Sequence, residues 1–228
     1  MIQYIVLQII LGIFLADVFG GAAHWFEDTY IHYCTTIPFF SEIAKHNELH
    51  HYFPRAMLEG SYYTNIESTI VFAIILFIIL YVLFPSTFTK YPIFYIVFFV
   101  FLCLVNLFHR FAHQRDCETN FIILKLQKMG ILCSHEHHRL HHVMQPDGKY
   151  CTIIPATNYL LDTFYFWRIL ELIISIFGVK PDRKPVYNHY ESIQNYMHEN
   201  AKKECPKRPT EKDVHILLKN LENHIKCY

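Results

Sequence analysis

The apolar positions of the chain gather in long runs that alternate with polar segments. Three of these runs are long enough to cross a membrane as helices: Met1–Ala16 (extendable to Ala23 if Asp17 is tolerated), Ser68–Phe84 and Tyr91–Phe108. Each offers close to the roughly 17–25 residues that a helix needs to span a bilayer. Only Pro85–Lys90 separates the second run from the third, which favours a membrane hairpin over a soluble core. We therefore predict an all-α, multi-pass membrane bundle.

Three shorter segments have a mixed pattern. Phe121–Cys133 combines apolar residues with two lysines, which is typical of a short amphipathic helix. Asn158–Val179 is apolar but carries three charged residues, so we expect an interfacial helix, with a fourth span as the alternative. Glu211–Lys226 predicts another amphipathic helix. We divide the chain into a membrane domain over 1–180 and a polar tail over 181–228.

Composition supports a membrane protein and argues against some other classes. Hydrophobic residues make up 53% of the chain, and the formal net charge is zero without a basic block, so we expect no nucleic-acid partner. The seven cysteines are scattered and form no C-x-x-C pair, which predicts reduced thiols rather than disulfides or cysteine-bound metal. The apolar N-terminus lacks the basic start of a signal peptide, so we expect it to be a span.

Histidines form the most informative pattern in the chain. Twelve of them lie between His24 and His142, and most belong to three clusters, which begin at His46, His109 and His137. A hairpin returns to the side that it left, so clusters before and after the hairpin face the same compartment. Lysine and arginine also concentrate on that side, whereas the hairpin tip has only Lys90, so the positive-inside rule predicts a cytosolic histidine-rich cap.

The spacing of these histidines is that of metal ligands. Residues four apart share one face of a helix, and ten imidazoles exceed the needs of one ion, so we predict two ions. The predicted ligands are His24, His46, His50, His51, His109, His113, His137, His138, His141 and His142. Imidazole binds zinc, copper, nickel and iron alike. A two-metal redox site beside lipid indicates oxygen chemistry on an alkyl chain, which favours two iron ions with dioxygen as co-substrate.

Other polar residues would support these ligands. Candidates for orienting the imidazoles are Asp17, Asp28, Asn106 and Glu136. Arg110, Arg139 and Lys149 are weaker candidates for contacts with a lipid headgroup. We expect no catalytic residue beyond the metal ligands. One alternative is that the clusters are polar loops, and another is a non-catalytic metal-binding or transport protein.

Several motifs together resemble the Kua/CarF lipid desaturase family. The resemblance rests on the motif A-D-x-x-x-G-x-x-x-H-W-x-x-D-T from Ala16, on H-H-x-x-P from His50, and on N-x-x-H-x-x-x-H-Q from Asn106. It continues in H-x-x-H-H from His138 and extends to about Arg183. The sequence departs from the family pattern at Glu59-Gly60-Ser61, where a further histidine followed by an acidic residue is expected.

The resemblance implies a di-iron, oxygen-dependent lipid desaturase of the endoplasmic reticulum membrane. Members that act on plasmanylethanolamine form the vinyl-ether double bond of plasmalogens, with electrons from NADH through cytochrome b5. We take this reaction as the first expectation for the chain. The alternatives are desaturation or hydroxylation of a phospholipid acyl chain.

Overall fold

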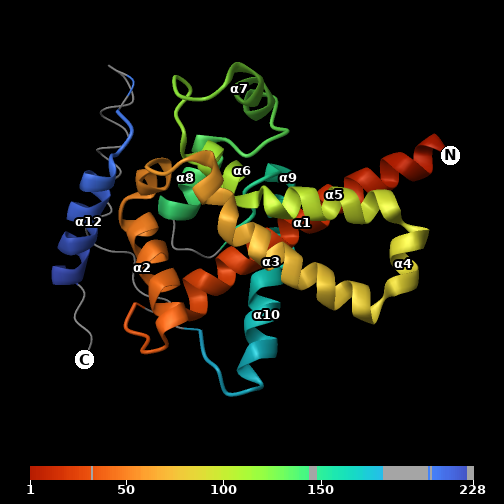
Figure 1. Cartoon of the computed structure of the whole chain (residues 1–228), viewed down its shortest axis with the longest axis horizontal. Helices are drawn as coiled ribbons and strands as arrows, with labels where there is room; N and C mark the ends of the chain where they lie inside the picture. Colours follow the sequence, from red (N-terminus) through yellow and green to blue (C-terminus); the bar gives the residue numbers. More distant parts are fainter. Residues whose placement is uncertain (32, 144–147, 182–204, 206, 225–228) are drawn as a thin grey trace.

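Long helices and a compact polar end make up the molecule. The computed structural model describes all residues except 32, 144–147, 182–204, 206 and 225–228, and the described part is helical without strands. The rods α1 (Ile2–Tyr30), α3 (Tyr62–Leu83) and α5 (Pro92–Cys103) project from the polar end (Figure 1). By length and composition α1 and α3 could cross a membrane, and α5 with α6 (Val105–His113) could form a third, bent span. This confirms the all-helical prediction.

Local sequence signals set where the helices begin. Proline occupies the first turn of α2 (Pro38–Tyr52), α4 (Pro85–Lys90), α5 and α9 (Pro155–Thr163), where its missing N–H costs nothing. Ser61 caps α3 by accepting a hydrogen bond from the backbone N–H of Thr64 at 3.2 Å. The two central apolar runs form α3 and α5, and the short α4 joins them into the predicted hairpin.

Small and polar side chains join the rods. A Cβ at Gly12 would lie 3.0 Å from the carbonyl oxygen of Phe94, so only glycine lets α1 approach α5 this closely. The side-chain oxygen of Gln8 accepts the otherwise unpaired N–H of Phe94 in the first turn of α5. These contacts satisfy backbone groups that lipid could not pair.

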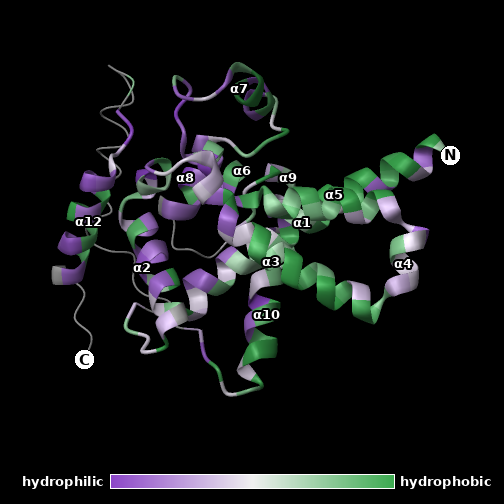
Figure 2. Cartoon of the chain, viewed as in Figure 1, coloured by the Kyte–Doolittle hydropathy of each residue, from purple (hydrophilic) through white to green (hydrophobic). Residues whose placement is uncertain are grey.

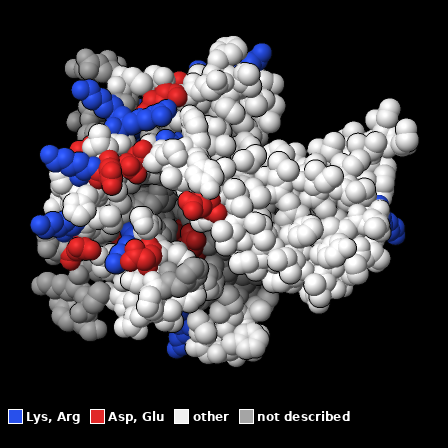
Figure 3. Space-filling model, in the orientation of Figure 1, with Lys and Arg blue, Asp and Glu red and all other residues white. Residues whose placement is uncertain are grey.

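A bend of 46° separates α5 from α6. The hydroxyl of Thr69 on α3 donates to the carbonyl of Cys103 at 2.6 Å, and so pairs a group at the break. Beyond the bend, α6 enters the polar end together with α2, η1 (Pro54–Leu58) and α8 (His135–Val143). Figure 2 shows hydrophobic rods and a largely hydrophilic end, and Figure 3 shows most of the charged side chains over that end.

The remaining helices surround this polar end. The predicted amphipathic helices are α7 (Phe121–Lys128) and α12 (Glu211–His224), and α12 packs against α2 with Leu221 buried. The predicted helix over Asn158–Val179 is two helices, α9 and α10 (Phe166–Ser175), because Tyr165 adopts a left-handed conformation with φ of 53° between them. Neither half is long enough to span a bilayer.

The prediction that all cysteines are reduced thiols is wrong. Cys117 and Cys205 form a disulfide across 88 residues of sequence, with their Cα atoms 5.9 Å apart. The bridge ties the loop after α6 to the segment that leads into α12. Cys103, Cys133 and Cys151 are free. Spacing along the chain does not reveal such a pairing, because the fold alone brings the two segments together.

Candidate metal centre

The three histidine clusters meet at the polar end. Eight of the ten predicted ligands fall into two groups, and within each group the candidate ligand atoms lie within 4.8 Å of one another. The first group, the five-histidine group, comprises His50, His109, His113, His138 and His142. The second group, the mixed group, comprises His24, Asp28, His51 and His141. The groups adjoin, since the rings of His24 and His109 are 4.9 Å apart between centroids.

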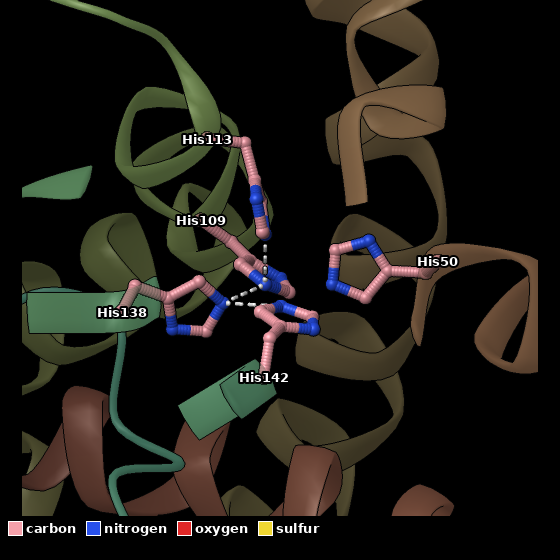
Figure 4. A group of neighbouring side chains, drawn as sticks. All are labelled: His50, His109, His113, His138 and His142. Atoms are coloured by element: carbon pink, nitrogen blue, oxygen red, sulfur yellow. Dashed lines mark hydrogen bonds between the residues drawn. The ribbon is translucent and has the colours of Figure 1, made fainter. Parts of the chain in front are cut away.

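Helix geometry positions the five-histidine group. His109 and His113 lie one turn apart on α6, His138 and His142 lie one turn apart on α8, and His50 reaches them from α2. Figure 4 shows the five rings directed toward one another from these three elements. The four-residue spacing therefore does what the sequence predicts, because each pair presents both imidazoles on one helix face.

The contacts between nitrogen atoms of this group are too many for hydrogen bonding alone. Nε2 of His109 lies 2.8 Å from Nε2 of His138 and 3.1 Å from Nε2 of His113. Nε2 of His138 also lies 3.2 Å from Nε2 of His142. Each neutral Nε2 has one proton or one in-plane lone pair, so four such atoms form at most two hydrogen bonds. Three contacts among them are better explained by lone pairs that converge on one cation.

The same distances match those between nitrogen ligands of one metal ion. For metal–nitrogen bonds of roughly 2.0–2.1 Å, two ligands at a right angle are about 2.9 Å apart, and two at the tetrahedral angle about 3.3 Å. The observed 2.8, 3.1 and 3.2 Å span these two values, as expected for nitrogen atoms around one ion. Five imidazoles also exceed the four ligands of a structural zinc site. The donor set thus fits a five- or six-coordinate ion such as iron.

Burial keeps the ligands of this group in their metal-binding form. Removal from water, reinforced by neighbouring imidazoles, lowers the pKa of His50, His138 and His142 well below 6.5. These imidazoles are therefore neutral near pH 7, and only a neutral imidazole has the lone pair that binds a metal.

The mixed group contains a carboxylate and two imidazoles whose tautomers can be assigned. Nδ1 of His24 lies 3.1 Å from the carbonyl oxygen of Tyr150, and Nδ1 of His141 lies 3.0 Å from that of Gly148. A carbonyl only accepts, so each Nδ1 is the protonated nitrogen and each Nε2 carries a lone pair. Both Nε2 atoms face Oδ2 of Asp28, at 3.6 Å from His24 and 3.2 Å from His141. With both rings neutral, two lone pairs face a carboxylate oxygen, and this arrangement suits a metal ion bound between the three atoms.

Asp28 also organises the rest of this group. Its Oδ1 accepts from Nδ2 of Asn47 at 2.9 Å and lies 2.9 Å from Nε2 of His51. Burial by itself would lower the pKa of His51. The facing carboxylate raises this pKa, and the net result is a value above that of an ordinary imidazole. Asp28 therefore helps His51 to hold a proton when no metal is bound. The sequence prediction placed Asp28 behind the ligands, whereas the structure places it among them.

One loop fixes the orientation of both assigned imidazoles. The loop supplies the carbonyls of Gly148 and Tyr150, and Asp17 on α1 holds it by accepting from the N–H groups of Ile153 and Ile154, each at 2.9 Å. Asn158 holds its middle through the N–H and the carbonyl of Cys151. Asp17 thus holds the loop whose carbonyls contact the imidazoles of His24 and His141.

Two predicted ligands lie outside both groups. His46 is exposed on α2, one turn before His50. His137 is buried on α8, but its Nε2 accepts from Nδ2 of Asn158 at 3.1 Å. Each has the four-residue spacing of a ligand pair, but it lies one turn before a candidate ligand, and neither group extends to that turn.

The other predicted site residues have contacts of their own. Glu136 is exposed and pairs with Arg139 at 3.1 Å. Asn106 is half-buried on α6, one turn before His109. The ammonium group of Lys149 lies 5.2 Å from the ring centroid of Tyr159. None of these contacts reaches a candidate ligand atom.

Arg110 is enclosed by protein acceptors. Its guanidinium donates to the carbonyls of Met57 at 3.0 Å, Leu58 at 2.8 Å and Gly60 at 2.7 Å, and also to the side chain of Asn65. Only 1% of Arg110 is exposed, so this guanidinium holds the end of η1 instead of facing lipid. Gly60, where the sequence departs from the family pattern, contributes its carbonyl to this arrangement.

Sequence reasoning missed one buried ion pair beside the centre. Arg55 on η1 makes two hydrogen bonds to Glu118, at 2.8 and 3.0 Å, with both side chains almost fully buried. The pair joins the element after His51 to the loop after His113. No local signal predicts it, because its partners are 63 residues apart. The place of Asp28 among the candidate ligand atoms, in contrast, had a signal, because Asp28 follows His24 by four residues on one helix.

Comparisons with known proteins point to one family. The profile of the lipid desaturase domain matches residues 13–184. A probable fatty acid desaturase of Acanthamoeba polyphaga mimivirus is 31% identical over 194 residues, which cover 83% of this chain and 90% of that protein. Plasmanylethanolamine desaturase 1 of Mus musculus is 28% identical, with coverage of 78% and 68%. Fatty acid desaturase 4-like 1, chloroplastic, of Arabidopsis thaliana is 27% identical, with coverage of 75% and 57%. No solved structure matches the chain.

Proposed function

Because the chain belongs to the lipid desaturase family, we propose that it is an integral membrane oxidoreductase that uses two iron ions and dioxygen to desaturate a lipid chain. The observation that carries this proposal is the convergence of eight imidazoles and one carboxylate from α1, α2, α6 and α8. Two irons with dioxygen supply the oxidising power that an unactivated C–H bond requires, which no side chain has.

The residues of the chain have distinct tasks in this proposal. The five-histidine group would hold one iron through neutral nitrogens, and the mixed group would hold the other with the charge of Asp28. The carbonyls of Tyr150 and Gly148 accept from Nδ1 of His24 and His141, so that Nε2 of each neutral ring would be free to bind the ion. Burial of the five-histidine group and of His24 and His141 would limit access of water, so that the oxidising equivalents would be directed to the lipid chain.

The substrate that we propose first is plasmanylethanolamine, whose desaturation gives a vinyl ether. Support comes from the sequence motifs and from the similarity to Plasmanylethanolamine desaturase 1 of Mus musculus. The runner-up is the acyl chain of a phospholipid, which is favoured by the names of the mimivirus and Arabidopsis relatives. Both reactions need the same centre and differ only in how the chain is placed.

The electron donor and the compartment extend the proposal. We propose cytochrome b5, reduced by NADH, as the donor, and the endoplasmic reticulum as the membrane. The excess of lysine and arginine at the histidine-bearing end supports a cytosolic orientation of that end.

Expression in cells that lack the vinyl-ether-forming desaturase tests the reaction and the substrate together. We expect iron in the purified protein and, by mass spectrometry, new vinyl-ether lipids or new acyl double bonds. His50→Ala should abolish the new lipids, whereas His46→Ala, one turn away on the same helix, should preserve them. Acyl products without vinyl ethers would select the runner-up. Bound zinc, no iron and an unchanged lipid profile would contradict the proposal of a desaturase and favour a non-catalytic metal-binding protein.

A further inference from the structure

Helix α10 has one packed face and one bare face. On the packed face Trp167 is 2% exposed and stacks against Trp25 of α1, with 6.1 Å between ring centroids. Glu171 on the same face accepts from Nε1 of Trp25 at 3.4 Å. The opposite face is apolar and exposed, with Leu172 67% exposed. The exposed residues of this face and the adjoining segment are Ile169, Leu172, Ile173, Ile176 and Phe177.

The bare face carries no charge that would suit it to water. Arg168 donates to both carboxylate oxygens of Glu171, at 3.0 and 2.9 Å, so the two charged side chains of α10 are engaged with each other. Phe177, just beyond the helix, is 80% exposed. A contiguous apolar surface of this kind on a folded protein marks a place where something apolar covers it.

The height of α10 relative to the spans identifies what covers it. A bilayer core of about 30 Å takes about 20 helical residues, which on α1 runs from Ile2 to near Gly21. Trp25, which α10 contacts, then lies about 6 Å beyond the hydrocarbon, within the headgroup layer. Figure 1 shows α10 running across the direction of the rods. Helix α10 is about 15 Å long, which is only half the thickness of the hydrocarbon core, so α10 cannot span the bilayer. Its contact with Trp25 places it in the interface.

A second helix has the same character on another side of the bundle. On α7, Phe121 is 76% and Ile122 is 65% exposed, and the helix also carries Lys125 and Lys128. An apolar face with lysines beside it is typical of a helix that lies on a membrane, where the lysine side chains reach back to the phosphates. In Figure 1, α7 and α10 project on opposite sides of the rods.

We propose that α7 and α10 are interfacial helices whose partner is the phospholipid leaflet around the spans. Their bare faces sink between the headgroups and the first carbons of the acyl chains, continuous with the apolar surface of the rods. The helices thereby hold the histidine centre at the headgroup level of this leaflet. This inference rests on membrane integration alone and stands whether or not the centre desaturates lipids.

Spin labels in the full-length chain, reconstituted in phosphatidylcholine nanodiscs, test the proposal. Leu172→Cys and Ile122→Cys place a nitroxide on each bare face, and Lys212→Cys on the exposed side of α12 is the matched polar control. The unsubstituted chain measures background labelling of its own cysteines. All three positions are exposed, so the substitutions leave the core intact. We expect positions 172 and 122 to be relaxed more by oxygen than by a water-soluble nickel chelate, with the reverse at 212.

Two results would overturn the inference. Nickel accessibility at 172 or 122 equal to that at 212 would put that face in water. The second result is strong dipolar coupling between labels at position 172 that is absent from nanodiscs holding one labelled chain. Such coupling would mean that a second copy of the chain covers the face. Neither result depends on metal content or activity, so the outcome is independent of the proposed reaction.

Discussion

Nε2 of His141 lies 3.2 Å from Oδ2 of Asp28, and the hydrogen bond from its Nδ1 to the carbonyl of Gly148 leaves that Nε2 without a proton in the neutral ring. A lone pair therefore faces a carboxylate oxygen inside the protein. Such a contact is repulsive unless a cation lies between the two atoms, either a proton on Nε2 or a metal ion, and the neighbouring Nε2 of His24 makes this a site where a metal ion could replace the proton.

Asp28→Asn tests this argument. The amide keeps nearly the same shape but loses the negative charge, so we expect the mixed group to lose its ion while the five-histidine group keeps its own. Metal analysis of the purified variant should then show about half of the wild-type iron, since two ions are proposed. Full retention of iron in this variant would show that Asp28 is not a metal ligand. Asp213→Asn, on exposed α12, is the control for a lost carboxylate.

Paired substitutions on α8 separate ligands from their neighbours. His141→Ala removes a nitrogen of the mixed group, and we expect iron affinity there to fall by more than the roughly 10–100-fold typical of outer partners. His137→Ala, one turn earlier, should retain both ions, because its Nε2 contacts Asn158. Competition titration with a chelator measures the difference. Equal losses in the two variants would refute the assignment of the groups.

Acid should weaken the metal-free protein. The folded-state pKa values of His50, His138 and His142 lie well below 6.5, so below pH 6.5 the unfolded chain binds more protons than the folded one. The stability due to these groups is complete above pH 6.5 and declines as the pH falls further. His51 has a raised pKa and opposes the trend, but the three lowered values outnumber it.

Thermal unfolding of the chelator-treated protein between pH 8 and pH 5, measured in detergent, checks this expectation. We expect the melting temperature to decrease as the pH is lowered from 8 to 5. We also expect the iron-loaded protein to release iron over the same range, because protons compete with the metal for imidazole. A melting temperature that rises toward pH 5 would show that the buried imidazoles are protonated in the folded state.

Arg110→Lys distinguishes a structural arginine from a lipid-binding one. Lysine cannot reproduce the planar fork that serves the carbonyls of Met57, Leu58 and Gly60, and each unpaired buried acceptor costs about 1–3 kcal/mol. We expect a clear loss of unfolding free energy in detergent, without lipid present. A normal melting temperature with a raised KM for lipid would favour the headgroup role instead.

The disulfide and the charge bias lead to different expectations for the compartment. Cys117 and Cys205 are bridged, and such bonds persist in oxidising compartments, whereas the excess of lysine and arginine around them favours the cytosol. Alkylation of thiols in intact cells, followed by reduction and a second alkylating reagent, decides between them by peptide mass spectrometry. We expect both cysteines to carry the second reagent if the bridge exists in the cell. The first reagent at both would show a reduced, cytosolic pair.

The sequence predicts most of the helices and the outline of the centre. Periodicity and charge locate α1, α3 and the bent α5–α6 pair, and four-residue spacing places His109 with His113 on one face. The sequence does not reveal which turn of α2 or α8 faces inward. His46 and His50 have the same local environment in sequence, and only the packing of α2 against its neighbours exposes the first and buries the second.

Long-range polar contacts are also beyond sequence reasoning. The Cys117–Cys205 bridge, the Arg55–Glu118 pair and the carbonyls around Arg110 each join segments that are remote along the chain. Their energies depend on mutual burial, which no local pattern encodes. The break at Tyr165 is hidden for a related reason, since tyrosine seldom adopts a positive φ and only its context imposes it.

The bend between α5 and α6 joins a candidate membrane span directly to a helix of the histidine centre. His109 follows Leu104, the residue at the bend, by only five positions. The direction in which its imidazole points therefore depends on how α5 is oriented. Inserting or deleting one residue in this short stretch would rotate both α6 histidines by about 100° and carry them out of the centre. Insertions in this stretch should therefore be far less tolerable than insertions of equal size in the loop before α7.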